Sequence, residues 1–323
     1  MTNTDARSLF TPEEIKALSE RSTAKGLWAV FFSWVLIAAC LAAAYISQSW
    51  LVVLLVWPII GSRQLALAIL MHEGAHRTLL ANRPWNDRIS QWLCAWPVFN
   101  DMQAYRVHHL RHHRFTGTDD DPDLGLATGF PITRKRFYQN IFRDLSGKVG
   151  VKVLFGSLLM LAGQINYSAG SGVSRADHSQ SSAAERITKA VKGLSGPLGM
   201  QAIIFGLCAT LASPWLYLLW LGSWLSTYML FVRWRCIAEH ALYTSSEDSL
   251  QSARTTLSNP LVRFFVAPMN VNYHLEHHLL MAVPFHQLPK MYKMLKDKGI
   301  YDQEETLWAK GYGQVFSEIS SLS

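Results

Sequence analysis

Two long apolar blocks constrain the fold of this chain more than any other feature of its sequence. No Asp, Glu, Lys or Arg occurs at positions 26–62 or 193–232. Each block is longer than the roughly 20 residues that a helix needs to cross the hydrocarbon core of a bilayer. Polar or helix-breaking residues interrupt each block near its middle, namely Ser47-Gln48-Ser49 and Ser213-Pro214. The blocks therefore predict two helical hairpins and four membrane spans.

The predicted fold class is an all-α integral membrane protein with a cytoplasmic helical cap. Charged residues make up only 16% of the chain, whereas soluble domains carry about 25%. The four predicted spans are residues 27–46, 51–71, 194–212 and 215–232. We expect a single domain in which cytoplasmic segments alternate with hairpins. Its segments are 1–26, 27–71 (first hairpin), 72–193, 194–232 (second hairpin) and 233–323.

The positions of the basic residues predict how the chain is oriented. All 30 Lys and Arg residues lie outside the two tight turns, and cytoplasmic loops carry the excess of positive charge in membrane proteins. We therefore expect a multi-pass protein of a bacterial inner membrane, with both termini and the middle segment in the cytoplasm. Nucleic-acid binding is not expected despite the net charge of +7, because the basic residues form no stripe.

Neither the remaining apolar segment nor the cysteines adds a span or a metal cluster. Residues 153–163 are apolar but only half as long as a span, which predicts a helix that lies on the membrane surface or dips partway into the membrane. The Ser- and Gly-rich stretch 166–182 indicates a loop. The four cysteines are far apart and include no C-x-x-C pair. We therefore expect the cysteines to be packing residues, not ligands of zinc or an iron–sulfur cluster.

The histidines are the residues most suited to chemistry, and most of the twelve lie in three clusters on the predicted cytoplasmic side. In the first cluster, His72 and His76 are four residues apart, so they share one face of a helix at a spacing that suits joint metal coordination. For this motif alone, a pair of interfacial histidines is the simpler explanation.

The other two clusters repeat one pattern, H-x-x-H-H. Positions i, i+3 and i+4 lie on one stripe of a helix, so the three imidazoles of each box can converge. The two boxes are His109, His112, His113 and His274, His277, His278. Chance repetition of this spacing is a poor explanation, and several ligands at one site are what a metal centre requires. Together the three boxes predict metal binding.

The number of histidines predicts more than one metal. Eight box histidines exceed the ligands that one four-coordinate ion can use, so we expect two metals with positions left open for a small molecule. His240 follows the fourth span closely enough to join them, although a surface role is the alternative. His108 is ambiguous, but the H-x-x-H-H register favours His109. No ligand role is expected for His178 or His286.

Imidazoles alone leave the metal open, since zinc, copper, nickel and iron all accept them. The three boxes, in this order and separated by apolar hairpins, closely resemble those of the membrane fatty acid desaturase superfamily of di-iron desaturases, hydroxylases and ketolases. The resemblance covers about residues 27–290. Ala238-Glu239-His240 also looks like the extra histidine that this family places before its last box. The metal ligands implied by the resemblance are His72, His76, His109, His112, His113, His240, His274, His277 and His278.

The resemblance implies two iron ions, a lipid or other apolar substrate that enters from the bilayer, and O2 that removes hydrogen from an unactivated C–H bond. The sequence has no nucleotide-binding fingerprint, no cytochrome b5-like segment and no cysteine cluster. We therefore expect electrons from a separate carrier such as ferredoxin or rubredoxin. The expected function is that of a fatty acyl desaturase, which introduces a C=C bond.

Several alternatives to an acyl desaturase stay open. The five-residue first box differs from that of the acyl-CoA Δ9 branch, which argues against an acyl-CoA substrate. The second box and the acidic run after it also resemble carotenoid ketolases and bacterial desaturases of smaller specialised substrates. An oxygen-inserting ketolase or hydroxylase is therefore one alternative. A metal transporter is less expected, because transporters place their ligands near the bilayer midplane.

Polar residues near the boxes are candidates for supporting roles. Glu73 is the favoured acceptor for the N–H of a ligand imidazole, and Glu239 and Glu276 are further candidates. The acidic run 119–123 is a weaker one, because a solvated loop explains it more simply. Arg63 falls within the second predicted span. We interpret it as snorkelling toward the cytoplasmic headgroups, with a contact to the substrate as the alternative.

Overall fold

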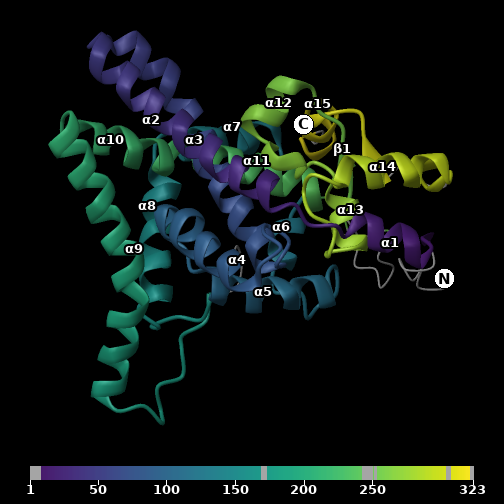
Figure 1. Ribbon diagram of the computed structural model, residues 1–323, viewed down its shortest axis with the longest axis horizontal. Coiled ribbons are helices and arrows are strands. Elements are labelled where there is room, and N and C mark those ends of the chain that lie inside the picture. Colours follow the sequence, from purple (N-terminus) through teal and green to yellow (C-terminus); the bar gives the residue numbers. More distant parts are fainter. Residues whose placement is uncertain (1–8, 169–172, 242–249, 251–252, 303–306, 321–323) are drawn as a thin grey trace.

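The computed structural model describes residues 9–168, 173–241, 250, 253–302 and 307–320, and most of them are helical (Figure 1). The long apolar helices are α2 (Thr23–Ser47), α3 (Trp50–Ala75), α9 (Ala183–Leu211) and the continuous run α10 (Trp215–Ser223), η4 (Trp224–Tyr228) and α11 (Met229–His240). Between α3 and α9 lie α4 (Arg83–Ile89), η2 (Ser90–Ala95), η3 (Trp96–Val98), α5 (Met102–Phe115), α6 (Leu124–Ala127), α7 (Arg134–Leu145) and α8 (Lys148–Leu161).

The ends of the chain contribute shorter elements. These are α1 (Pro12–Leu18), α12 (Pro260–Phe265), η6 (Pro268–Asn270), α13 (His274–Leu279), α14 (Leu288–Asp297), η7 (Ile300–Asp302) and α15 (Tyr312–Ile319). Two strands of two residues each, β1 (Thr255–Thr256) and β2 (Trp308–Ala309), pair in parallel. This pairing is a small departure from the predicted all-α fold.

Four helical stretches in the described part of the chain are long and apolar enough to cross a membrane. They are Pro12–Ser47, Trp50–Ala75, Ala183–Leu211 and Trp215–His240. Large apolar side chains stand exposed on them, among them Trp28, Ile46, Leu55, Leu211 and Leu218. Soluble monomers rarely expose contiguous apolar surface of this kind. The prediction of a mostly helical protein with four apolar helices is confirmed, and these helices indicate a membrane protein.

The two predicted turns lie where the long helices break. Gln48 ends α2 in the left-handed conformation, with φ of 48°, and Ser49 precedes α3. Pro214 precedes α10 and starts it with a fixed φ. Helix α2 packs along α3, and α9 contacts α10. The polar and helix-breaking residues therefore separate the apolar helices as the sequence predicts.

Helix α9 begins well before the predicted start of the third span at residue 194. It starts at Ala183 because Ser182 and Glu185 form a capping box: the Glu185 backbone N–H donates to Ser182 Oγ at 3.2 Å, and the Ser182 N–H donates to Glu185 Oε2 at 2.8 Å. The hydropathy pattern missed this start because Lys189 and Lys192 lie in the first turns. Helix α8 likewise extends the predicted segment 153–163 toward its N-terminus.

The π-helical segment η4 is held between α3 and α8 by two glycines. A Cβ on Gly61 would lie 2.2 Å from Thr227 Oγ1, and one on Gly150 would lie 2.1 Å from the Leu225 carbonyl oxygen. Only glycine permits approaches this close. The turn of η4 is thus fixed against two neighbouring helices just before α11, which carries His240.

The interpretation of Arg63 as a snorkelling residue is wrong. Its side chain is buried at 3% exposure and lies between α3 and α12, with the guanidinium 4.3 Å from the Phe264 ring centre. Its Nη2 donates hydrogen bonds to the Phe264 carbonyl oxygen and, at 2.8 Å, to Ser62 Oγ. These hydrogen bonds join Arg63 on α3 to α12, so its side chain does not reach outward, while its buried Nε has no partner among the described residues.

The N-terminal and C-terminal elements pack together beside the histidine-bearing helices. Leu18, Leu275, Met291 and Leu295 belong to one buried apolar cluster, and Figure 1 shows α1 next to α13 and α14. The Lys298 ammonium donates to Glu14 Oε2 at 2.7 Å across this contact. The last histidine box therefore lies on a helix that the N-terminal segment helps to hold.

Candidate metal centre

Four helices supply the nine histidines of the predicted ligand set. His72 lies in the last turn of α3 and His76 is its C-cap, while His240 is the last residue of α11. The second and third boxes lie on α5 and α13. We expected the first box to follow its span, but α3 continues through His72 without a break. Three of the histidines thus lie at the ends of the long apolar helices.

The structure brings five of these histidines into one group. Their ring nitrogens lie within 4.8 Å of one another. The group consists of His72, His76, His109, His113 and His277. His113 Nε2 lies 3.1 Å from His109 Nε2 and 2.9 Å from His277 Nε2. Boxes from three separate parts of the chain therefore face a common point.

The other four histidines form a second group beside the first. His112, His240 and His278 have ring nitrogens within 4.8 Å of one another, and His240 shares a similar set with His274 and Glu239. His274 Nε2 lies 2.9 Å from His240 Nε2 and 3.1 Å from His278 Nε2. The ring centres of His278 and His113 are 4.4 Å apart, so the two groups are adjacent. All nine predicted histidines thus lie in one compact cluster.

The state of these imidazoles fits a metal site. Both ring nitrogens of His72 and of His76 are buried and have no hydrogen-bond partner among the described residues. Burial, with the Arg106 guanidinium as the next cause, lowers the pKa of His76 to about 3. Burial also lowers the pKa of His109 and His277 well below the ordinary value. These imidazoles are therefore neutral, which is the form that binds metal.

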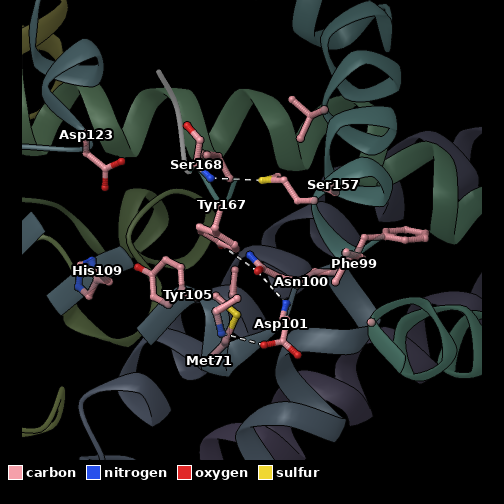
Figure 2. Close-up of a pocket in the computed structure, with 18 of the residues that line it drawn as sticks. Met71, Phe99, Asn100, Asp101, Tyr105, His109, Asp123, Ser157, Tyr167 and Ser168 are labelled. Carbon is pink, nitrogen blue, oxygen red and sulfur yellow. Dashed lines mark hydrogen bonds between the residues drawn. The ribbon is translucent and has the colours of Figure 1, made fainter. Parts of the chain in front are cut away.

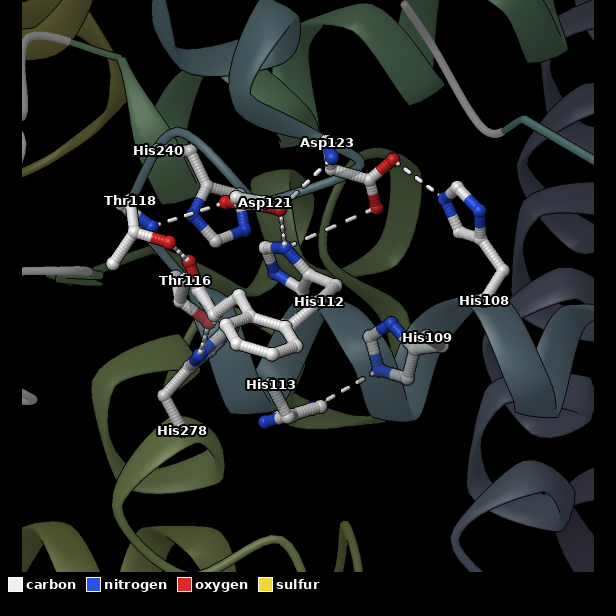
Figure 3. Close-up of polar contacts among 12 residues, drawn as sticks. His108, His109, His112, His113, Thr116, Thr118, Asp121, Asp123, His240 and His278 are labelled. Atoms are coloured by element: carbon white, nitrogen blue, oxygen red, sulfur yellow. Dashed lines mark hydrogen bonds and ion pairs between the residues drawn. The ribbon is translucent and has the colours of Figure 1, made fainter.

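An aspartate of the acidic run orients one of these imidazoles. His112 Nδ1 donates to Asp121 Oδ1 at 2.8 Å, and Asp121 also accepts the backbone N–H groups of Gly117 and Asp123 (Figure 3). Burial acts to raise the pKa of Asp121, but the His112 hydrogen bond keeps it below the ordinary value. The carboxylate fixes the His112 tautomer and leaves Nε2 for a metal. The interpretation of this run as a solvated loop is wrong for Asp121, which is 8% exposed.

Glu73 does not have the role that the sequence favoured. Its Oε2 accepts hydrogen bonds from Thr78 Oγ1 at 2.8 Å and from the Phe285 backbone N–H at 3.0 Å. Its Oε1 lies 3.8 Å from His72 Nδ1, too far for a hydrogen bond. Glu73 instead ties the end of α3 to the loop after α13. The sequence could not reveal these partners, because they come from distant positions.

Glu276 and Glu239 also bond elsewhere. Buried Glu276 accepts hydrogen bonds from the hydroxyl groups of Thr255 and Tyr301, which anchor α13. Glu239 Oε1 accepts from Arg235 Nε at 2.6 Å and lies 3.6 Å from His274 Nδ1. Neither therefore holds the N–H of a box imidazole.

The remaining histidines lie outside both groups. Figure 3 shows that His108 Nε2 is hydrogen-bonded to Asp123 Oδ1, at 2.8 Å. His109, which the H-x-x-H-H spacing favoured, lies in the five-histidine group, and His108 does not. His178 and His286 belong to none of the groups of close ligand atoms found among the described residues. The cysteines contribute no ligand there either, although Cys236 lines the cavity described next.

A cavity of about 930 Å³ leads from the histidines to the gap between α8 and α9. His109, His112, His240 and His274 line its inner end, and Lys189 and Lys192 line its outer end. Both lysines are exposed. Between the ends, apolar walls come from α3, η3 and η4, with Leu65, Val98 and Trp224 among the lining residues. The cavity can therefore admit a molecule with an aliphatic part to the histidine cluster.

Sequence reasoning missed the polar residues at the inner end of this cavity. The Tyr105 ring stacks on that of His109, with centres 5.0 Å apart, and Tyr105 lies between His109 and Tyr167 in Figure 2. Arg235 lies on the wall formed by α11. Helical spacing could have revealed two of them, because Tyr105 precedes His109 by four residues and Arg235 precedes Glu239 by four. Tyr167 lies in the irregular segment after α8, where no such pattern exists.

Comparison with known proteins assigns the chain to a protein family. Residues 48–309 match the fatty acid desaturase family. The chain is 30% identical to a dihydrorhizobitoxine desaturase of Bradyrhizobium elkanii over 300 residues, which cover 90% of this chain and 81% of that protein. It is 21% identical to an sn-1 acyl-lipid omega-3 desaturase (ferredoxin) of a Nostoc species, over 95% of this chain and 87% of the relative.

The chain is also 22% identical to an sn-1 oleoyl-lipid 12-desaturase of a Picosynechococcus species. This match covers 90% of this chain and 79% of the relative. The family match covers most of the chain and includes all three histidine boxes. These relatives are desaturases, so the chain is an oxidoreductase with a histidine cluster compatible with metal. The protein belongs to the fatty acid desaturase family.

Proposed function

We propose that the protein is an O2-dependent di-iron desaturase that introduces a C=C bond into an aliphatic substrate. The observation that carries this proposal is the division of nine histidines into two adjacent groups, one of five and one of four. Two ions at neighbouring positions would account for both groups, whereas one ion has no use for so many imidazoles. A desaturase needs such a pair for a reaction that consumes two electrons besides those of the C–H bonds.

The residues of the chain would bind the irons, orient a ligand imidazole and shield the site from water. His72, His76, His109, His113 and His277 would hold one iron, and His112, His240, His274 and His278 would hold the other. The bound irons would supply the O2 chemistry that removes hydrogen from an unactivated C–H bond. Asp121 keeps His112 in one tautomer. The apolar walls of the cavity exclude water, which protects the oxidising site.

The atoms and electrons of the proposed reaction balance with one external donor. The substrate loses two hydrogen atoms, and O2 takes up these, two electrons and two protons to give two molecules of water. We propose a separate one-electron carrier such as ferredoxin or rubredoxin as the donor. The name of the Nostoc relative, which includes ferredoxin, supports this choice.

The substrate that the sequence favours is a fatty acyl chain of a membrane lipid. Two relatives whose names specify acyl lipids support this choice, as do the four apolar helices. A smaller specialised substrate is the second candidate, supported by the 30% identity to the dihydrorhizobitoxine desaturase. An oxygen-inserting reaction would use the same cluster, so the product must be measured.

Incubation of the iron-loaded protein with reduced ferredoxin, host lipid extract and 18O2 tests the reaction. We expect a product that has lost two hydrogen atoms and carries no label, with all 18O recovered in water. Retention of 18O in the product would show oxygen insertion and contradict desaturation. Mass spectrometry of lipids and small metabolites from an expressing host, compared with an empty vector, would identify the substrate.

We further propose that both termini and residues 72–193 are cytoplasmic, in a single multi-pass domain of the bacterial inner membrane. The charge-free turns at Gln48 and Ser213 support this orientation, since basic residues avoid translocated loops. A periplasm-active reporter such as alkaline phosphatase should be active when inserted at either turn and inactive when fused to the C-terminus. Activity of the C-terminal fusion would contradict the orientation.

A further inference from the structure

The inner end of the cavity is more polar than the path of an unsubstituted hydrocarbon chain requires. Asn100, Tyr105, Tyr167 and Arg235 line the cavity, and the Tyr105 ring stacks on that of His109. A methylene chain offers no hydrogen-bond acceptor, so it would cover these donors without satisfying them. Burying a polar group in this way costs free energy. These polar groups therefore favour a substrate that carries a hydrogen-bond acceptor.

Part of this polar lining is a row of aromatic and amide groups. Tyr105 stacks on His109, and its ring centre lies 6.3 Å from that of Tyr167. The Tyr167 hydroxyl donates to Asn100 Oδ1 at 2.9 Å, and the same oxygen accepts the Asp101 backbone N–H at 2.8 Å. These two hydrogen bonds fix the Asn100 side chain with its Oδ1 toward Tyr167 and the Asp101 backbone. In the described part of the chain, no residue bonds to Asn100 Nδ2 or to the Tyr105 hydroxyl, so both remain available to the cavity.

A further polar side chain of the cavity is that of Arg235, on α11. Its Nε donates to Glu239 Oε1 at 2.6 Å, and that carboxylate oxygen lies 3.6 Å from His274 Nδ1. Glu239 therefore fixes Arg235 next to the four-histidine group. Arg235 and Tyr105 line the same cavity. No described residue bonds to the Arg235 Nη atoms, which line the same space.

We infer that the substrate carries a hydrogen-bond-accepting oxygen close to the bond that is oxidised, held by Tyr105, Asn100 and Arg235. The substrate is then an oxygen-substituted aliphatic molecule, and its carbon chain lies against the apolar walls that include Leu65, Val98 and Trp224. The oxygen fixes which C–H bonds face the histidine groups, because the donors stand beside His109 and His274. This inference rests on the proposed function and specifies its substrate class.

Binding of three small probes tests the inference. Dibutyl ether and nonane have the same number of heavy atoms and differ by one oxygen, and octanoate supplies a carboxylate. Calorimetric titration would use the iron-loaded protein in nanodiscs, with empty nanodiscs subtracted. We expect dibutyl ether or octanoate to bind about tenfold more tightly than nonane. Tighter binding of the ether assigns a neutral oxygen, and tighter binding of octanoate assigns a carboxylate. Equal binding of all three probes would overturn the inference.

Two variants locate the preference at the proposed donors. Tyr105→Phe removes only a hydroxyl, and Arg235→Lys keeps a positive charge beside Glu239 while losing the guanidinium fork. We expect each to reduce the preference for the oxygen-bearing probe about threefold to tenfold. Tyr138→Phe, on the exposed face of α7, is the matched control and should keep the preference. An unchanged preference in both donor variants would overturn the inference.

Separate measurements distinguish failure of this inference from failure of the proposed function. Iron content, melting temperature and the 18O2 assay report on the metal centre and its reaction, whereas the ratio of dissociation constants reports on the donors alone. Normal iron content with no preference between the probes rejects the oxygen-bearing substrate and leaves the desaturase proposal intact. Conversely, a protein without iron that still prefers the oxygen-bearing probe rejects the di-iron reaction only.

Discussion

Replacing His277 with alanine is expected to reduce turnover to less than about a hundredth of the wild-type rate and to lower iron content. His277 Nε2 lies 2.9 Å from His113 Nε2, and its ring also contacts those of His72 and His76. Loss of an outer partner of a ligand already costs about 10–100-fold, so loss of a ligand should cost more. Elemental analysis of the purified protein and a product assay would measure both effects.

The control for this variant is His178→Ala, because His178 lies in the segment between α8 and α9 and outside both histidine groups. We expect it to keep wild-type iron content and turnover. Both variants should insert into the membrane normally, since α13 is a short helix outside the four apolar stretches. Full iron content and full turnover of His277→Ala would refute the ligand assignment.

Replacing Asp121 with asparagine should lower iron affinity about 10–100-fold while leaving the fold intact. Asparagine has almost the same shape and can still accept backbone N–H groups, but it lacks the negative charge that orients and strengthens His112. The effect should therefore appear as a weaker apparent affinity in an iron titration, with turnover recovering at high iron concentration.

Asp120→Asn is the matched control. The Asp120 carboxylate is exposed, and its one ion pair among the described residues is a surface pair with Arg111, at 3.9 Å. Such pairs contribute little, so we expect no change in iron affinity. If the two variants had equal affinities, the role assigned to Asp121 would be wrong.

The sequence predicted the helices and the shared face of each histidine box because both follow from local geometry. That the boxes meet was expected from the number of histidines and from the resemblance to the family. Apolar runs broken at Gln48 and Pro214 specify where helices start and stop, and i, i+3, i+4 spacing puts the imidazoles of each box on one face. His240 was the exception, since a lone histidine carries no such pattern. Its position just after the fourth predicted span made it a candidate, and the resemblance to the family strengthened that expectation. Its position next to His274 and His278 comes from the packing of α11 against the β1 and α13 region.

The sequence could not specify which residues far apart in the chain contact each other. Arg63 meets Phe264, and Glu73 meets Phe285, across more than two hundred residues. Asp121 reaches His112 because the chain folds back after α5, which no periodicity encodes. Helix α9 was placed too late for a different reason: its start depends on one capping box, and the apolar pattern begins only after several polar turns.

The contribution of α13 to both histidine groups sets the order in which the centre can be built. His277 completes one group, and His274 and His278 complete the other, yet α13 lies near the C-terminal end of the chain. Both groups therefore stay incomplete until α13 has been translated, after all four apolar helices. A metal that needs either complete group would then be bound only after these helices have left the ribosome. Nascent chains truncated before α13 would leave the translocon with both histidine groups incomplete.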